Sequence, residues 1–391
     1  MKTVSVKSLD ELVEAGVIQL TRGKIISKTD MAACPGNYPV YSSAKENDGK
    51  FGEYGRFMFD EDLITWSVDG GGRLFYRPKH KFSVTNVGGV LRILDRATLD
   101  YRYLFYALTL RHSEITFDWV KKAHPSVIRK LYADIPVLPI PEQQRIVGIL
   151  DEAFDGIATA KANAEQNLQN ARALFESHLQ SVFTQRGEGW VRARMDAIYR
   201  VGSSKRVLKS EWKSEGVPFY RGREVTRLAA NGFVDNELFI SEEHFAELSK
   251  EYGVPKSGDI VITAIGTIGN AHIVRGSDRF YFKDASVLWM KRSAEVSSEF
   301  IKFWLKSSLF FDQLDRGNGA TVDTLTIQKL QSVELFLPPI DEQLKIVAQL
   351  DSLSEETQRL ESLYQRKLAA LDELKKSLLH QAFSGQLIRD N

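Results

Sequence analysis

The chain has 391 residues, 43% of them hydrophobic, and its 52 basic and 51 acidic residues give a net charge of +1. The length allows two or three domains with separate cores, and the near-zero charge leaves any binding of a polyanion to be argued from local clusters. A single cysteine, Cys34, excludes an internal disulfide and a thiolate metal cluster, which fits a reducing compartment. Residues 1–14 hold no apolar stretch long enough for a signal peptide or membrane helix, so we expect a cytoplasmic protein.

Residues 1–137 are predicted to form a first α/β domain. The apolar run Leu63–Trp66 is typical of a strand, and Tyr103–Leu110 is typical of a short helix. Two segments, Gly71–Phe82 and Trp119–Ala133, contain several cations and no acid. Phosphate contacts require such clusters, although chance clustering on a solvated surface also explains any one of them.

Residues 138–184 are predicted to form a long helix. The segment lacks proline after its first turn, and its apolar residues recur three and four positions apart. Pro139 and Pro141 precede the helix or lie in its first turn, where a missing backbone N–H costs little. Roughly 40 helical residues at ~1.5 Å each make a rod about 60 Å long, which needs a partner of similar length.

Residues 185–336 are predicted to form a second α/β domain that repeats the first. The motif Val217-Pro-Phe-Tyr220 parallels Tyr38-Pro-Val-Tyr41 at an offset of 179, whereas Ile262-Thr263 parallels Ile64-Thr65 at an offset of 198. The difference implies about 19 extra residues in the second copy, around Ala229–Tyr252. Two domains that share one fold but differ in most of their residues are what we expect of modules that recognise different targets.

The second domain has its own predicted elements and charge cluster. Asp259–Ile265 and Ala285–Met290 are typical of strands, and Phe300–Leu305 is typical of a helix. The segment Arg200–Arg227 carries eight Lys or Arg residues against three Glu. This excess of cations is again compatible with phosphate contacts.

Residues 337–391 are predicted to form a second long helical region. Residues 338–351 match residues 138–151 without a gap, and eight of the fourteen positions are identical. Because each rod needs a partner, we expect the two helices to pair with each other as an antiparallel coiled coil. The alternative is that each helix packs only on its own domain.

The candidate DNA contacts are cations, amides and one threonine, some inside these clusters and some outside them. Arg and Lys can bond to guanine, Asn and Gln to adenine, and other cations hold phosphates. The candidates are Lys45, Arg73, Arg77, Lys79, Lys81, Asn86, Lys121, Lys122, Lys205, Arg206, Arg221, Arg223, Arg227, Thr267, Asn270, Arg279 and Lys283. For each of them, a surface charge or a salt-bridged side chain is the simpler interpretation.

The chain resembles the DNA-specificity subunit of a type I restriction-modification system. Four motifs carry the resemblance, which covers essentially the whole chain: Leu138-Pro-Ile-Pro-Glu-Gln143, Leu337-Pro-Pro-Ile-Asp-Glu-Gln343, Gly266-Thr-Ile-Gly269 and Gln381-Ala-Phe-Ser-Gly-Gln-Leu387. The resemblance implies target recognition domains at 1–137 and 185–336, and helical spacers at 138–184 and 337–391. In the first domain Val68-Asp-Gly-Gly71 replaces the Gly-Thr-Ile-Gly loop, which puts a shared role for this loop in doubt.

The resemblance also implies how the protein works. Each recognition domain reads one half of a split site in double-stranded DNA, and the paired helices fix the distance between the halves. Two methyltransferase subunits with S-adenosylmethionine and restriction subunits that use ATP and magnesium do the chemistry. This chain itself is expected to have no cofactor, metal or catalytic residue, and no membrane partner.

The residues agree with a non-catalytic chain. No Gly-rich loop followed by Lys-Ser or Lys-Thr is available for nucleotide phosphates, and no Asn-Pro-Pro or Asp-Pro-Pro motif is available for a flipped adenine. The seven histidines show no metal-binding spacing. Three alternatives stay open: an enzyme that cuts or modifies DNA unaided, a coiled-coil scaffold without DNA binding, and the specificity subunit of a related methyltransferase-nuclease with a split site.

Overall fold

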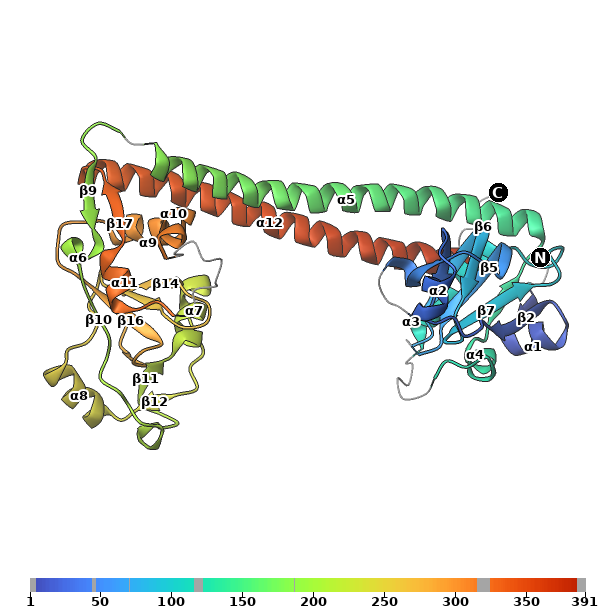
Figure 1. The fold of residues 1–391 in the computed structure, drawn as a ribbon, viewed down its shortest axis with the longest axis horizontal. Helices are drawn as coiled ribbons and strands as arrows, with labels where there is room; N and C mark the ends of the chain where they lie inside the picture. Colours follow the sequence, from blue (N-terminus) through green and yellow to red (C-terminus); the bar gives the residue numbers. More distant parts are fainter. Residues whose placement is uncertain are drawn as a thin grey trace. The chain divides into compact units, whose positions relative to one another are not determined.

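The computed structural model describes residues 5–43, 47–69, 71–115, 122–185, 187–314 and 324–384. The chain divides into two compact units (Figure 1). Unit 1 comprises residues 1–165 and 366–391, and unit 2 comprises residues 166–365. Each unit contains part of both long helices, α5 (Ile140–Thr184) and α12 (Ile340–Phe383).

Unit 1 contains a six-stranded sheet with the order β2-β7-β5-β6-β3-β4. Neighbouring strands are antiparallel except for β3 and β6, which are parallel. The first and last strands before α5, β1 and β8, form a separate small antiparallel pair. The elements before α5 are β1 (Ser5–Lys7), α1 (Leu9–Glu14), β2 (Ile18–Arg22), α2 (Lys28–Ala33), β3 (Tyr38–Tyr41), η1 (Asn47–Gly49), β4 (Lys50–Tyr54), β5 (Phe59–Ser67), β6 (Leu74–Val84), β7 (Gly88–Ile93), α3 (Tyr101–Glu114), α4 (Pro125–Leu131) and β8 (Ile135–Val137).

The main core of unit 1 lies between its sheet and α3. Ile64 and Trp66 of β5 pack with Leu104 and Leu108 of α3, and all four side chains are buried. The indole N–H of Trp66 donates to the carbonyl oxygen of Ala123 at 2.7 Å, so the one polar atom of this ring is satisfied inside the core. The strand predicted at Leu63–Trp66 and the helix predicted at Tyr103–Leu110 are therefore confirmed within β5 and α3.

Unit 2 contains two larger sheets with the orders β10-β16-β13-β14 and β12-β11-β15. The first is antiparallel throughout, while β11 pairs with β15 in parallel. β9 and β17 form a separate antiparallel pair. The elements are β9 (Val191–Arg194), α6 (Met195–Ile198), β10 (Tyr199–Gly202), η2 (Lys209–Glu211), β11 (Val217–Tyr220), α7 (Gly222–Asn231), β12 (Phe239–Ile240), α8 (Glu242–Glu251), β13 (Ile260–Thr263), β14 (Ala271–Ile273), β15 (Tyr281–Phe282), β16 (Val287–Arg292), α9 (Ser298–Lys306), α10 (Ser308–Leu314), α11 (Ile327–Ser332) and β17 (Glu334–Leu337).

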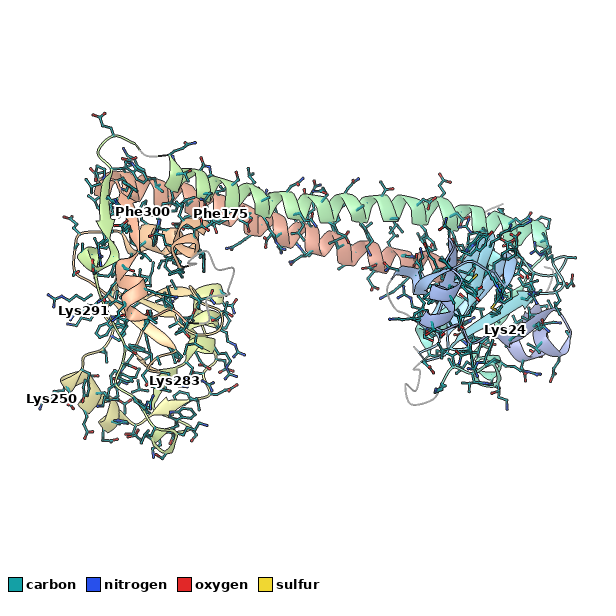
Figure 2. The ribbon with its side chains drawn as sticks, in the orientation of Figure 1. Lys24, Phe175, Lys250, Lys283, Lys291 and Phe300 are labelled. Atoms are coloured by element: carbon teal, nitrogen blue, oxygen red, sulfur yellow. The ribbon has the colours of Figure 1, made fainter. Side chains whose placement is uncertain are left out.

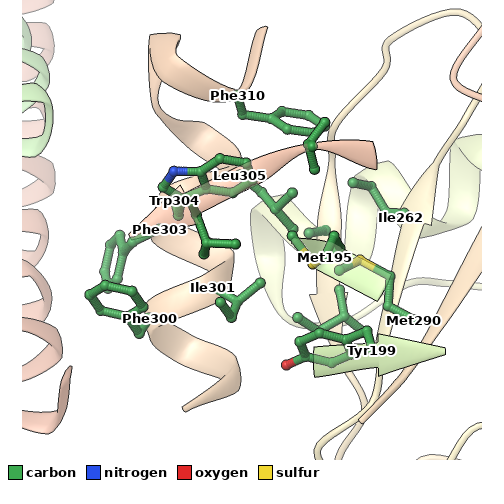
Figure 3. Packing of buried hydrophobic residues seen from close by; sticks show 14 of the residues in the cluster. Met195, Tyr199, Ile262, Met290, Phe300, Ile301, Phe303, Trp304, Leu305 and Phe310 are labelled. Atoms are coloured by element: carbon green, nitrogen blue, oxygen red, sulfur yellow. The ribbon is translucent and has the colours of Figure 1, made fainter. Parts of the chain in front are cut away.

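The core of unit 2 lies between α9 and the β10-β16-β13-β14 sheet. Figure 3 shows Ile301 and Leu305 of α9 facing Ile262 of β13 and Met290 of β16, and all of these side chains are buried. On the other side of α9, Phe300 contacts Phe183 of α5 edge to face, with the ring centroids 5.2 Å apart. The predicted strands and helix of the second domain are confirmed as β13, β16 and α9.

The two units repeat one backbone plan, as the sequence offsets predict. Val40 of β3 pairs with Ser83 of β6, and Phe219 of β11 pairs with Tyr281 of β15, so the parallel strands keep the same register. The extra residues of unit 2 lie where β12, α8 and the end of α7 occur, between β11 and β13. Added elements at this place leave the shared sheet pairing intact.

In unit 1 the first part of α5 runs antiparallel to the last part of α12. Lys161 forms an ion pair with Asp372 at 2.7 Å, and the ammonium of Lys375 lies 5.0 Å from the ring centroid of Phe154. Ile146 and Leu150 of α5 share a core with Leu379 and Ala382 of α12. The α12 residues that contact α5 have lower numbers where the α5 residues have higher ones. The predicted antiparallel pairing is therefore confirmed.

In unit 2 the rest of α5 and α12 pair in the same sense. Arg172 forms an ion pair with Glu361 at 2.8 Å, and Leu179 and Phe183 share a core with Ile346 and Leu350. Phe175 of α5 packs against the same core, which also contains Phe300 (Figure 2). Both ion pairs are partly exposed, so the buried apolar residues stabilise the pairing more than the charges do.

The Glu-Gln motif at the start of each long helix fixes the helix to its domain. The buried side chain of Gln143 accepts a hydrogen bond from the backbone N–H of Asp100, the N-cap residue of α3, at 2.9 Å. Gln343 accepts from the N–H of Ser297, the N-cap residue of α9, at 3.0 Å. Each amide also donates to a backbone carbonyl just before its own long helix, that of Leu138 or Pro338. One glutamine side chain therefore bonds to the backbone at the start of the long helix and at the start of the domain helix.

Candidate nucleic-acid interface

Five of the predicted DNA contacts of unit 2 line one open cavity of about 510 Å³. The cavity lies at the start of α7, beside the loop that follows β13 and the end of β15. Three arginines and one lysine line it, and no acidic residue does. Its lining consists of Arg221, Gly222, Arg223, Thr226, Arg227, Ile265, Thr267, Lys283 and Ser286, which we call the arginine cavity.

The buried carboxylate of Glu224 does not line the arginine cavity, but it holds two of the arginines that do. Arg221 is the N-cap residue of α7 and Glu224 lies three positions later, so the carboxylate reaches back to the backbone N–H of Arg221 at 2.9 Å. The side chain of Arg221 donates through Nε at 3.1 Å and Nη2 at 2.8 Å to the same carboxylate. Nε of Arg223 donates to Glu224 at 3.0 Å, and its Nη2 donates to Glu237 at 2.6 Å.

The ionisation of Glu224 follows from these contacts. Its side chain is 2% exposed, and this burial raises the pKa of the carboxyl. The hydrogen bonds from the side chain and backbone N–H of Arg221 and from the side chain of Arg223 outweigh the burial and lower the pKa to about 2. Glu224 is therefore an anion at neutral pH, and the two arginines form a fixed group around it.

The loop after β13 forms the opposite wall of the arginine cavity. The hydroxyl of Thr263 donates to the carbonyl oxygen of Thr267 at 2.5 Å and accepts from the N–H of Asn270 at 3.0 Å. Gly266 and Gly269 adopt φ of 76° and 92°, which favours glycine, so the Gly-Thr-Ile-Gly spacing is a conformational requirement of the turn. The turn leaves the side chain of Thr267 and the apolar side chain of Ile265 exposed at the cavity.

The remaining cations of the arginine cavity are exposed. Lys283 follows β15, and its backbone N–H donates to the carbonyl oxygen of Tyr220 at 2.8 Å; Figure 2 labels its side chain. Within the part of the chain that the structure describes, the side chains of Arg227 and Lys283 have no hydrogen-bond or ion-pair partner. The buried hydroxyl of Ser286 has no hydrogen-bond partner among the described residues either. The side chains of Arg227 and Lys283 are therefore available to a ligand.

The other predicted contacts of unit 2 do not line the arginine cavity. Asn270 supports it, because its amide donates to the hydroxyl of Thr226 at 3.1 Å. Arg206 pairs with Asp284 at 2.9 Å, and Arg279 pairs with Glu242. The ammonium of Lys205 lies 5.3 Å from the ring centroid of Tyr252. All three cations are exposed, so they remain predictions as phosphate contacts.

The predicted contacts of unit 1 are more scattered. Lys79 and Lys81 are exposed on β6, and the ammonium of Lys81 lies 4.9 Å from the ring centroid of Phe57. Arg73 is exposed with its guanidinium 5.1 Å from the ring centroid of Phe75. Lys122 pairs with Asp69 at 3.3 Å. The backbone carbonyl of Asn86 accepts from Arg22 at 2.8 Å, and Lys45 and Lys121 lie outside the described residues.

Arg77 lies inside unit 1. Its side chain donates from Nε to the hydroxyl of Thr65 at 3.1 Å and from Nη2 to the carbonyl oxygen of Asp48, and the residue is only 5% exposed. Its guanidinium lies 3.6 Å from the ring centroid of Tyr41. Burial lowers the pKa of Arg77 to about 10. These contacts give Arg77 a packing role in the core, which disfavours the predicted contact with DNA.

Several residues of the arginine cavity were not among the sequence predictions. Ile265 and Ser286 are neutral, so the charge patterns that marked their neighbours contain no signal for them. Glu224, which supports the arginine cavity without lining it, is different, since a carboxylate three residues after an N-cap position is a known helix-start pattern. That spacing predicts the contact with the backbone of Arg221, although not the burial. Within the described residues, no group of three His, Cys, Asp or Glu side chains could hold a metal ion, and no helix is long and apolar enough to cross a membrane.

Comparison with known families gives two matches to one domain. The sequence model described as "Type I restriction modification DNA specificity domain" matches residues 1–170 and again residues 187–368. These two matches fall on the two copies of the internal repeat. The same domain type is therefore found twice in the chain.

Curated proteins and solved structures agree with the family match. A type I specificity subunit of Mycoplasma pneumoniae (strain ATCC 29342 / M129 / Subtype 1) is 24% identical over 340 residues, which is 86% of this chain and 87% of that protein. A type I restriction enzyme specificity subunit of Haemophilus influenzae (strain ATCC 51907 / DSM 11121 / KW20 / Rd) is 25% identical over 362 residues, covering 88% and 86%.

The solved structures show the fold. One, from a study of complex assembly and conformational transition of the type I R-M system, has a TM-score of 0.69 at 15% identity and covers 94% of this chain and 97% of that one. The HsdS subunit from Thermoanaerobacter tengcongensis has a TM-score of 0.55 at 15% identity with the same coverage.

Proposed function

The chain belongs to the type I restriction modification DNA specificity family, and from this we propose that it reads a two-part target in double-stranded DNA for partner subunits that do the chemistry. Sequence-specific DNA recognition is the function of the family, and specificity subunits are non-catalytic.

The arginine cavity is the observation that carries the proposal. It gathers three arginines and one lysine on one face of unit 2 with no acidic residue in its lining. Cations on one face are the electrostatic requirement for phosphate contacts, and guanidinium groups can also read base edges. A scaffold that only joins proteins has no need of such a surface.

The internal repeat supports a target with two parts. Two domains of the same family lie in one chain, and they keep matched strand register while their exposed residues differ. Each predicted recognition domain, 1–137 and 185–336, then reads one half-site. The long helical regions, 138–184 and 337–391, serve as the predicted spacers between them.

The partners follow from the family. We expect assembly with two methyltransferase subunits that use S-adenosylmethionine to methylate adenine, and with ATP-dependent restriction subunits that need magnesium. This chain binds none of these cofactors in the proposal. The variant with a related methyltransferase-nuclease as partner differs only in the proteins that co-purify, so purification of the tagged chain from its own cells distinguishes the two.

Selection from a random pool of duplexes tests the proposed function. The complex of this chain with its methyltransferase subunits is expected to retain duplexes that share a common word. Retention of unrelated duplexes, or of none, would contradict sequence-specific recognition. The purified chain alone is incubated with DNA, magnesium and S-adenosylmethionine as the control for an unaided enzyme, and neither cleavage nor methylation is expected.

A further inference from the structure

The two units carry different side chains at matched backbone positions beside the parallel strand pair. In unit 2 the backbone N–H of Lys283 donates to the carbonyl of Tyr220, and in unit 1 the N–H of Thr85 donates to the carbonyl of Tyr41 at 2.9 Å. The next residue after each of these tyrosines is Arg221 in unit 2 and Ser42 in unit 1. One scaffold position therefore presents a guanidinium in one unit and a hydroxyl in the other.

In unit 1 hydrogen-bonded hydroxyl groups surround the matched position. The hydroxyl of Thr85 donates to that of Ser42 at 2.8 Å, and Thr85 is only 3% exposed. The hydroxyl of Ser43 donates to the carbonyl of Val87 at 2.5 Å, and Ser67 donates to the carbonyl of Ser43 at 3.2 Å. These neutral groups bond to one another and to the backbone. At the same place unit 2 has an open cavity with cations.

Within that cavity, Arg221 is held in one orientation by Glu224. The carboxylate occupies Nε and one N–H of Nη2, which is the side edge of the guanidinium. Among the described residues the outer edge, formed by Nη1 and the second N–H of Nη2, has no hydrogen-bond partner and can donate two parallel hydrogen bonds. Arg223 is less free, because its Nη2 already bonds to Glu237 at 2.6 Å.

Guanine is the base that fits two parallel donors. In the major groove it presents two adjacent acceptors, O6 and N7, while adenine presents one acceptor beside a donor. A guanidinium can only donate, so adenine and cytosine leave one of its donors opposed by an amino group or unpaired. Fixing the side chain in advance also lowers the entropy lost on contact.

We propose that unit 2 reads a guanine of its half-site through the outer edge of Arg221, and that Glu224 is the positioning residue that aims it. Arg227 and Lys283, whose side chains form no hydrogen bond or ion pair with the described residues, hold the flanking phosphates. This inference rests on the proposed function and adds to it the base that is read and the residue that reads it.

The test compares Arg221→Lys with wild type in the complex with the methyltransferase subunits. Binding is measured for duplexes that carry every single-base replacement of the selected word. Arg221→Lys keeps the charge beside Glu224 but removes the two parallel N–H donors of the guanidinium. The preference for guanine at one position of one half-site is therefore expected to fall about tenfold or more. The preferences at the other positions of the same half-site are expected to be unchanged, which would show that unit 2 of the variant is folded, and the other half-site is expected to be unaffected.

Two further variants separate base reading from phosphate contacts. Lys283→Thr introduces the residue that unit 1 has at the matched position, Thr85. This variant is expected to weaken the binding of all duplexes alike. It is also expected to lower the slope of log K against log salt concentration by about one. Glu224→Gln leaves Arg221 charged but weakens its support, so it is expected to lower the guanine preference without that change in slope. Lys250→Ala, on the exposed end of α8 (Figure 2), removes one charge elsewhere in unit 2 and serves as the control.

Two outcomes would overturn the inference. In one, Arg221→Lys keeps the wild-type base preferences at every position. In the other, it weakens all duplexes equally, as expected of a phosphate contact. Both differ from a failure of the proposed function, in which the wild-type complex itself shows no base preference.

Discussion

At the residue scale, the carboxylate of Glu224 makes the stability of unit 2 depend on pH. Its folded-state pKa of about 2 lies below the ordinary value of 4.5, so its contribution is fully present above pH 4.5 and is lost as the pH falls toward 2. A shift of this size corresponds to stability on the order of 3 kcal/mol. The difference in unfolding free energy between wild type and Glu224→Gln is therefore expected to shrink over this range. Chemical denaturation of both proteins at several pH values measures it, and a constant difference would contradict the ionised form.

Arg77 gives a second prediction at this scale. Because its guanidinium is packed against Tyr41 and hydrogen-bonded to Thr65, Arg77→Ala is expected to lower the free energy of unfolding by about 2 kcal/mol or more. Lys79→Ala, an exposed cation on the same strand, is expected to change it by about 0.5 kcal/mol or less. Equal effects in a denaturant titration would show that Arg77 is a surface residue.

The sequence predicted the residues of the arginine cavity better than it predicted their contacts. The local excess of cations in Arg200–Arg227 was enough to identify Arg221, Arg223 and Arg227, because this excess can be read from the sequence alone. The burial of Arg77 could not be predicted in the same way. It depends on Tyr41, which lies 36 positions earlier and reaches Arg77 only through the parallel pairing of β3 and β6.

At the element scale, the glutamine of each Glu-Gln motif connects a long helix to a domain helix. Gln343→Ala is expected to destabilise unit 2 by about 1–3 kcal/mol, because the buried N–H of Ser297 and the carbonyl of Pro338 lose their partner. Gln349→Ala, at an exposed position of the same helix, is the matched control and is expected to have little effect. Thermal unfolding of the three proteins provides the measurement. Equal midpoints would contradict a structural role of this side chain.

Helices and strands were predicted well where the apolar pattern was long or repeated. The stripe of residues three and four apart predicted the presence of the long helices α5 and α12, because it extends over about ten turns. The copied motif at residues 138–151 and 338–351 predicted that the two helices are alike. The glutamine contacts were not predicted, since neither the identity nor the place of their backbone partners is encoded near the motif.

At the scale of the whole molecule, the predicted role of the long helices as a spacer has a direct test. Seven residues inserted after Glu165 and seven after Gln365 lengthen both helices by about 10 Å, which is about three base pairs of DNA. The number of unspecified base pairs in the target is expected to grow accordingly. An unchanged spacing in duplexes selected by the variant complex would show that the helices do not set it.

The family and the repeated domain could be predicted from the sequence because the motifs and the constant offsets extend over the whole chain. The target word could not, since base contacts depend on side-chain orientation within each unit. Arg221 illustrates this limit. The sequence shows that Arg221 lies among other cations, but only the contact with Glu224 shows which edge of its guanidinium is already bonded.

Mapping of the methylated adenines tests most directly the claim that one chain reads two separate words. Genomic DNA is treated with this chain and its methyltransferase subunits, and the methylated positions are sequenced. Two short fixed words separated by a constant number of unspecified base pairs are expected. A single contiguous word around every methylated adenine would contradict the claim.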